Sequence, residues 1–239
     1  DTVCCISRSV ADELEAWMSG AALSFQYRRP AVRWFHLGAD LEHSAPSTGW
    51  PEAYTKVTDA MNARPTFLMV GTLEPRKGHA QALTAFEALW AAGQALNLVI
   101  VGKSGWLVDD LIERIRSHSE SGGRLFWLCN ASDECLEDLY GLATCLLAAS
   151  EAEGFGLPLI ESARRGLPIL ARDLPVFREV AGTAAYYFSD NSDAGLSDSI
   201  AHWLALCEEG KAPIPDGLAW LTWQQSASQL TAILPTSHD

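Results

Sequence analysis

Thr66-Phe-Leu-Met-Val-Gly71 is an apolar run that ends in glycine, and Leu96-Asn-Leu-Val-Ile-Val-Gly102 repeats the pattern after a stretch of helical periodicity. Strands without alternating polar residues are buried on both faces, so helices must cover both sides of their sheet. Four more runs continue this alternation of strand and helix, at residues 124–129, 144–149, 167–171 and 184–188. The sequence therefore predicts an α/β fold with a Rossmann-like, doubly wound parallel sheet.

The segments around these runs indicate how the chain is organised. Helical periodicity predicts helices at residues 80–92, 107–118, 134–142, 158–165, 176–181 and 196–207. Strand, helix and strand patterns near the start, at residues 2–7, 10–18 and 31–36, predict a short βαβ piece before the main unit. Residues 36–64 are rich in Gly, Pro, Ser and Ala, which is typical of a linker, and residues 221–234 predict an amphipathic helix.

Composition limits the classes of function. The 239 residues are 48% apolar, which suffices for a core, and the formal net charge is -13. A general nucleic-acid binder needs excess cations to displace phosphate counterions, so we expect no nucleic-acid partner. We find no apolar run of about eighteen residues that would span a membrane, and Asp1-Thr-Val-Cys-Cys-Ile6 lacks the basic region and cleavage site of a secretory signal.

Cysteine and histidine usage gives two further expectations. The six cysteines include no CxxC pair, and four of them lie in or beside apolar runs. We interpret them as reduced core residues of a cytoplasmic protein. The six histidines are scattered without ligand spacing, so we expect no metal site, and nothing in the sequence indicates a bound cofactor.

Ligands of doubly wound sheets bind beyond the carboxyl ends of the strands, and the first candidate loop there is Gly71-Thr-Leu-Glu-Pro-Arg-Lys-Gly78. Its glycines allow a ligand to approach the backbone, and Arg76 and Lys77 supply two cations that suit a diphosphate. The alternative is a solvated basic turn, and the spacing of a Walker loop is absent. A second loop, Gly102-Lys-Ser-Gly105, offers either amides for a ligand or only a tight turn.

The third candidate loop is Glu151-Ala-Glu-Gly-Phe-Gly-Leu-Pro-Leu-Ile-Glu161, directly after the fourth apolar run. Pro158 suits the start of a helix, and the glycines before it leave the loop bare. Glu161 then lies in the first turn, where its carboxylate can accept hydrogen bonds from sugar or ribose hydroxyls. The simpler interpretations are a surface charge for Glu153 and a favourable helix-dipole charge for Glu161.

Together these segments resemble the GT-B glycosyltransferases that include bacterial mannosyltransferases, glucosyltransferases and sucrose-phosphate synthases. Glu153-Gly-Phe-Gly-Leu-Pro-Leu-Ile-Glu161 matches the E-x7-E signature of that group. Val70-Gly-Thr-Leu-Glu-Pro-Arg-Lys-Gly78 resembles its phosphate loop, and Leu98-Val-Ile-Val-Gly-Lys-Ser-Gly-Trp106 resembles its next βα turn. The resemblance implies one half of a GT-B fold, with a nucleotide-sugar-binding domain at 65–239, a linker at 41–64 and, at 1–40, a remnant of the acceptor domain.

The same resemblance implies a retaining hexosyltransferase that uses a nucleoside-diphosphate sugar without a metal. It assigns catalytic roles to Glu153, Lys77 and Arg76. It assigns donor binding to Gly71, Thr72, Phe155, Gly156, Leu157 and Glu161. In this assignment the two cations hold the diphosphate and Glu161 holds the ribose hydroxyls. Glu153 and the backbone of residues 155–157 hold the transferred hexose.

Departures from the family pattern leave several questions open. Thr72 stands where many members have an arginine that contacts phosphate, so either Arg76 takes over that charge or the site is weaker. Glu74-Pro-Arg-Lys77 favours GDP-mannose as donor, with a glycan or lipid-linked acceptor bound through an N-terminal domain that this chain largely lacks. The alternatives are a UDP-hexose donor and a non-catalytic nucleotide-sugar-binding module, while the complete signature argues against a sugar epimerase. We expect a cytoplasmic location, with contact to the inner face of the membrane left open.

Overall fold

The computed structural model describes residues 1–20, 29–40, 49–190 and 192–234. Its centre is a six-stranded sheet in which every neighbouring pair of strands is parallel. The strands are β3 (Thr66–Val70), β4 (Asn97–Val101), β5 (Leu125–Leu128), β6 (Cys145–Ala148), β7 (Ile169–Arg172) and β8 (Ala185–Phe188). All six predicted strands are therefore confirmed, and so is the parallel sheet.

The order of the strands is β5-β4-β3-β6-β7-β8, so the sheet winds outward in both directions from β3 and β6. One half is built by the connections from β3 to β5, and the other half begins at β6. The loops after β3 and β6 consequently diverge from the middle of the sheet at its carboxyl edge. This topological switch point is where open α/β sheets bind their ligands.

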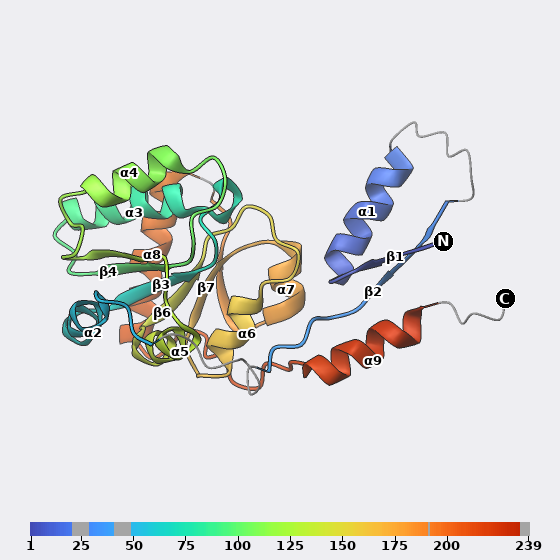
Figure 1. Cartoon of the computed structure of the whole chain (residues 1–239). Helices are drawn as coiled ribbons and strands as arrows, with labels where there is room; N and C mark the ends of the chain where they lie inside the picture. The colour runs from blue at the N-terminus through green and yellow to red at the C-terminus, as the bar shows by residue number, and fades with distance from the viewer. Residues whose placement is uncertain (21–28, 41–48, 191, 235–239) are drawn as a thin grey trace.

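Helices cover both faces of the sheet, as Figure 1 shows. The first face packs against α3 (His79–Ala91), α4 (Asp109–Ser117) and α8 (Asp193–Glu208). The second packs against α2 (Tyr54–Ala63), α5 (Asp133–Leu142), α6 (Leu157–Ala163) and α7 (Pro175–Ala181). On the first face Phe67 stacks edge-on against Phe86 and Trp203, with ring centroids 5.5 and 5.4 Å apart. Burial of such rings gives the sheet a rigid centre.

Helix α2 corrects the linker predicted over residues 41–64. Its buried residues Val57, Ala60 and Met61 recur at helical spacing and face the sheet. Asn97, at the start of β4, donates through Nδ2 to the carbonyl oxygen of Ala60 at 2.7 Å. A helix this short depends on such packing rather than on propensity, which explains why composition misjudged it. Residues 41–48 of the predicted linker lie outside the described part of the chain.

The N-terminal βαβ piece forms as predicted, with β1 (Thr2–Cys5) parallel to β2 (Ala31–Trp34) and α1 (Arg8–Gly20) packed on them. We call residues 1–20 and 29–40 the N-terminal unit. The predicted C-terminal helix is also present, as α9 (Trp223–Ile233), but it lies beside β2 rather than on the central sheet (Figure 1). The N-terminal unit and the C-terminal helix α9 thus pack together at one side of the molecule.

Two properties of the whole chain bear on the earlier expectations. In the described ranges, no helix combines the length and the apolar character that crossing a bilayer requires. All six cysteines are free thiols, and Cys5, Cys135 and Cys145 are buried as predicted. Cys129 is exposed, so the interpretation of every cysteine as a core residue is wrong for this one, which follows β5 at the open edge of the sheet.

Candidate functional site

The candidate site lies at the switch point, where the loop after β3 meets the loop after β6. The β3 loop contains a short 3-10 helix at Pro75–Lys77 and ends at Gly78. The amide of Glu151 donates to the carbonyl oxygen of Arg76 at 2.7 Å and joins the loops directly. Gly78 has a φ of 71°, and a Cβ placed there would lie 2.2 Å from the carbonyl oxygen of Ala149. Only glycine therefore allows the two loops to pack this closely.

The loop after β4 supports the β3 loop from its other side. Leu73 donates from its amide to the carbonyl oxygen of Lys103 and accepts from the amide of Gly105, both at 2.9 Å. A Cβ on Gly102 would lie 1.9 Å from the carbonyl oxygen of Gly71. The interpretation of residues 102–105 as a tight turn fits these contacts, because the glycines let the β4 loop pack closely against the β3 loop.

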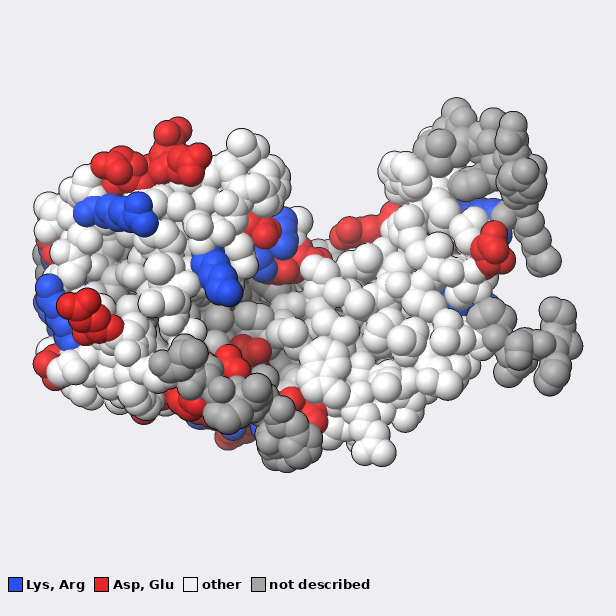
Figure 2. Space-filling model, viewed as in Figure 1, with Lys and Arg blue, Asp and Glu red and all other residues white. Residues whose placement is uncertain are grey.

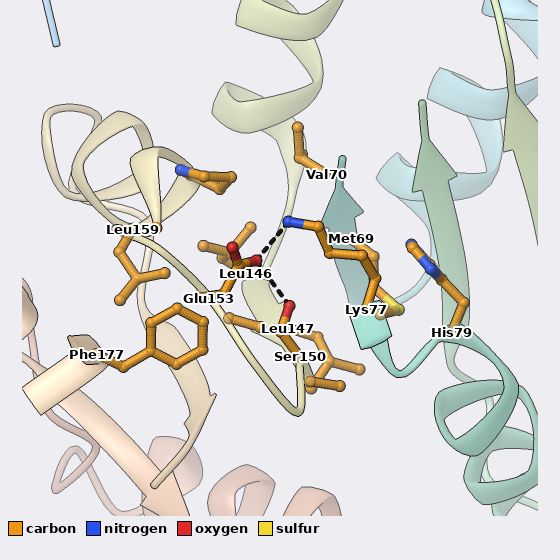
Figure 3. A pocket seen from close by; sticks show the side chains of 14 residues that line it. Met69, Val70, Lys77, His79, Leu146, Leu147, Ser150, Glu153, Leu159 and Phe177 are labelled. Atoms are coloured by element: carbon orange, nitrogen blue, oxygen red, sulfur yellow. Dashed lines mark hydrogen bonds and ion pairs between the residues drawn. The ribbon is translucent and has the colours of Figure 1, made fainter. Parts of the chain in front are cut away.

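A cluster of opposite charges joins the two loops (Figure 3). Lys77 forms an ion pair with Glu153, and Arg76 approaches the other carboxylate oxygen of Glu153 to 3.3 Å through Nη1. Arg76 also pairs through Nη2 with Glu74 at 2.9 Å, and the Ser150 hydroxyl donates to Glu153 Oε1 at 2.9 Å. The side chain of Glu153 is only 12% exposed. Glu153 is therefore not the surface charge of the simpler interpretation.

His79, at the start of α3, is buried and lies on the side of Lys77 away from Glu153 (Figure 3). Burial, reinforced by the charge of Lys77, lowers the pKa of His79 to about 4. The imidazole is consequently neutral at pH 7 and adds no third positive charge to the cluster. Its Nδ1 has no hydrogen-bond partner among the described residues. His79 also lines a cavity of about 20 Å³ together with Lys77 and Glu153.

Glu161 lies beyond the first turn of α6, which corrects the prediction that placed it there, because the helix begins at Leu157. It is half-buried, and its Oε2 accepts a hydrogen bond from the Tyr140 hydroxyl at 2.7 Å. Burial raises the pKa of Glu161 above its ordinary value, against the opposing effects of Tyr140 and the nearby Arg165 and Arg164. Helix α6 begins at Leu157 after a left-handed Gly156; Pro158 has no amide hydrogen, and the amide of Leu159 donates to the carbonyl oxygen of Gly156 at 3.0 Å. The Glu161 carboxylate thus follows closely on the backbone of residues 155–157.

One cleft of about 620 Å³ brings the predicted site residues together. Its lining includes all nine of them: Gly71, Thr72, Arg76, Lys77, Glu153, Phe155, Gly156, Leu157 and Glu161. Figure 2 shows the face of the molecule hollowed between the central sheet and the N-terminal unit, with charged side chains of both signs at the edge. Sequence reasoning from separate loops thus identified residues that share one cavity.

The structure adds residues that the sequence did not single out. Ile6 and Leu37, from the N-terminal unit, line the cleft and pack beside Phe155 of the loop after β6. Tyr140 and Ser150 hold the two glutamates, as described above. Ser150 directly follows a predicted strand, and this position could have identified it as a site residue. Nothing in the local sequence indicates that Tyr140 contacts Glu161.

The family model and the related sequences that match this chain are all glycosyltransferases by description. The family described as Glycosyl transferases group 1 matches residues 52–215. The serotype-specific mannosyltransferase WbdA of Escherichia coli is 48% identical over 98% of this chain, which spans only 29% of that protein. The O-antigen chain mannosyltransferase B of Escherichia coli is 31% identical over 56% of this chain and 35% of its own length.

Solved structures agree on the fold. Anabaena Alr3699/HepE in complex with UDP and glucose superposes with a TM-score of 0.71 at 16% identity, over 97% of this chain and 63% of that one. Sucrose-phosphate synthase from Thermosynechococcus elongatus gives 0.70 at 22% identity, over 98% and 57%. At such identities the likeness concerns the fold alone, one half of a GT-B architecture. Because the family match extends over most of the described sheet and its loops, the chain belongs to the glycosyl transferases group 1 family.

Proposed function

We propose that this chain forms the donor half of a retaining mannosyltransferase that transfers mannose from GDP-mannose to a glycan or lipid-linked acceptor. The observation that carries the proposal is the convergence of Lys77, Arg76, Glu153 and Glu161 in a single cleft at the switch point. Two cations, two carboxylates and bare backbone amides match the charges and hydroxyls of a nucleoside-diphosphate sugar.

Each group has a proposed part of the donor to bind. Lys77 and Arg76 hold the diphosphate and stabilise the charge that develops on it as the sugar departs. Arg76 takes over the positive charge of the arginine that many family members have at the position of Thr72. It lies in the same loop as Lys77 and approaches the same carboxylate, that of Glu153. Glu161 accepts from the ribose hydroxyls, with Tyr140 fixing its carboxylate.

Glu153 then has two successive partners. Without donor, its carboxylate neutralises Lys77 and reaches Arg76. A diphosphate brings more negative charge than one carboxylate and takes over both cations. Glu153 is thereby released to accept hydrogen bonds from the hexose, beside the backbone of Phe155, Gly156 and Leu157. In this proposal, binding of the diphosphate therefore also frees Glu153 to form the hexose subsite.

The relatives favour mannose over the UDP-hexose alternative. Both curated relatives described above are mannosyltransferases by name, one of them acting on the O-antigen chain. We therefore place this chain in the assembly of an O-antigen-like polysaccharide. Free thiols at all six cysteines suit the reducing cytoplasm, at the inner face of the membrane where the acceptor is lipid-linked. The non-catalytic alternative is disfavoured because Lys77 and Glu161 both line the cleft.

The acceptor side is proposed to continue from the N-terminal unit. Residues 1–40 resemble the last βα unit of an acceptor domain, and Ile6 and Leu37 already form part of the cleft wall. The chain spans 29% of the length of WbdA.

Calorimetric titration of the 239-residue chain with GDP, UDP and ADP tests the donor site. We expect binding with preference for GDP, and a loss of at least tenfold in affinity for Lys77→Ala and Glu161→Ala, about what a lost charged hydrogen bond costs. Lys103→Ala is the matched control, since Lys103 is an exposed cation on the neighbouring loop. Absence of binding to all three nucleotides, or binding indifferent to both changes, would overturn the proposal.

A further inference from the structure

Glu179, on α7, joins the central sheet and its covering helices, here called the central domain, to the N-terminal unit through four polar contacts. Its carboxylate accepts from the backbone amides of Arg8 and Ser9, both at 2.8 Å, and from the Ser9 hydroxyl at 2.6 Å. His36 Nε2 lies 2.6 Å from Glu179 Oε1. The side chain is 15% exposed, so these contacts replace most of its water.

These contacts cap helix α1 from outside the N-terminal unit. Arg8 and Ser9 are the first residues of α1, whose first amides have no intrahelical acceptor. Ser7 accepts from the amide of Val10 at 3.2 Å and so caps the remainder of the turn. A carboxylate at this end also opposes the helix macrodipole favourably. The start of α1 is therefore fixed in place by a residue of α7.

The N-terminal unit reaches back from this anchored turn to the loop that carries Glu153. The Ser7 hydroxyl donates to the carbonyl oxygen of Gly154 at 2.8 Å. Ile6 Cδ1 lies 2.9 Å from where a Cβ on Gly154 would stand. The ring of His36 lies 5.3 Å from the ring of Phe155. His36 is itself a partner of Glu179, and Ser7 directly precedes Arg8, whose amide donates to Glu179, so both routes from Glu179 lead to the residues that follow Glu153.

We infer that Glu179 is a positioning residue: through Ser7 and His36 it sets the conformation of residues 154–155 and thereby the hexose subsite. It does so without contacting the donor, because it lies outside the cleft lining and adjoins instead a smaller cavity of about 160 Å³ with His36. The inference rests on the proposed function for the identity of the subsite. The loop itself is irregular, so its shape depends on such tertiary contacts.

Hydrogen exchange of the 239-residue chain tests the mechanical part without any ligand. In Glu179→Gln we expect the amide of Leu159, which donates to the carbonyl oxygen of Gly156 at 3.0 Å, to exchange about tenfold faster, because hydrogen bonds to a charged group are lost at the anchor of this loop. Amides of residues 71–78, which contact neither Ser7 nor His36, should exchange as in the wild type. Arg178→Gln is the matched control: Arg178 lies on the same helix as Glu179, its exposed ion pair with Asp173 is removed, and the exchange of the Leu159 amide should stay unchanged.

Titration with GDP and with GDP-mannose tests the functional part. Glu179→Gln should bind GDP within about twofold of the wild type and lose about tenfold of the extra affinity contributed by the hexose. Ser7→Ala, at the other end of the path, should show the same split, and the double variant should lose little more, since the two residues act in series. A merely structural role would weaken GDP and GDP-mannose binding equally.

The possible results separate this inference from the donor-site proposal. Wild-type chain that binds GDP-mannose more tightly than GDP, with an equal difference in Glu179→Gln, overturns the inference and leaves the donor site standing. Wild-type chain that binds no nucleotide overturns the proposed function, while the exchange experiment still decides whether Glu179 orders residues 154–157. Additive losses in the double variant also count against a shared path.

Discussion

At the scale of single residues, Glu161 is expected to reduce the stability of the folded chain at neutral pH. Its half-buried carboxylate accepts a hydrogen bond from the Tyr140 hydroxyl, and burial raises its pKa above the ordinary 4.5. The folded chain therefore binds the proton of Glu161 more tightly than the unfolded chain does. The stability that this group contributes is fully present below about pH 4.5 and is lost as the pH rises through the raised pKa of the folded state.

Glu161→Gln should consequently be more stable than the wild type at pH 7, while binding nucleotide more weakly. The amide keeps an acceptor for Tyr140 and removes the buried charge. Urea unfolding between pH 4 and pH 8 should show the advantage of the variant shrinking as the pH falls towards 4.5, where the wild-type carboxyl becomes protonated. Parallel pH profiles for the two proteins would contradict this account.

At the scale of elements, the site depends on two loops packed without a side chain between them. Gly78 closes the β3 loop against the end of β6, and Gly102 lets the β4 loop close on it from the other side. This close packing holds Lys77 and Glu153 within reach of each other, although they belong to different βα units. The loops, more than the strands, determine whether the cleft is assembled.

Gly78→Ala and Gly166→Ala form a matched pair that measures this packing. Both glycines are left-handed, with φ of 71° and 66°, but a Cβ meets Ala149 only at Gly78 and open space at Gly166. Gly166→Ala should cost about 1 kcal/mol of backbone strain and leave nucleotide affinity intact. Gly78→Ala should cost clearly more in urea unfolding and weaken GDP binding at least tenfold. Equal effects of the two changes would show that strain alone, not loop packing, matters at Gly78.

At the scale of the whole molecule, the C-terminal helix α9 packs beside the N-terminal unit. The Ser226 hydroxyl of α9 donates to the carbonyl oxygen of His36 at 2.7 Å, and the amide of His36 donates to Gln229 Oε1 at 3.2 Å. Because His36 also contacts Glu179, the C-terminal helix, the N-terminal unit and the central domain meet at one residue. We expect α9 to stabilise the N-terminal unit against the cleft.

Gly38→Ala tests that expectation. A Cβ at Gly38 would lie 2.3 Å from the amide nitrogen of Trp223, so the substitution should push α9 away from the segment after β2. Limited proteolysis should then cleave within residues 223–233 far faster than in the wild type, while the central strands stay protected in hydrogen exchange. Gly20→Ala is the control, since no atom of the described residues lies within 4 Å of a Cβ placed there. Unchanged cleavage in Gly38→Ala would contradict the coupling.

Much of this protein could be predicted from its sequence, because the decisive signals are local. Runs such as residues 66–70 and 97–101 are buried on both faces, and that requirement alone implies the parallel sheet and its covering helices. The E-x7-E segment marks the loop at the switch point because a strand, glycines and a helix start are all contiguous there. Helix α2 was missed because its apolar positions are too few to signal a helix without the sheet they pack on.

What only the tertiary structure decided are the contacts between distant segments. The pairing of Lys77 with Glu153, the hydrogen bond of Tyr140 to Glu161 and the cap that Glu179 provides for α1 each join residues from different elements. Periodicity and motif spacing describe how a segment folds, but they carry no information on which charge neutralises which across two loops. That choice follows from the register of the sheet and the packing of its helices, which bring these side chains to one cleft.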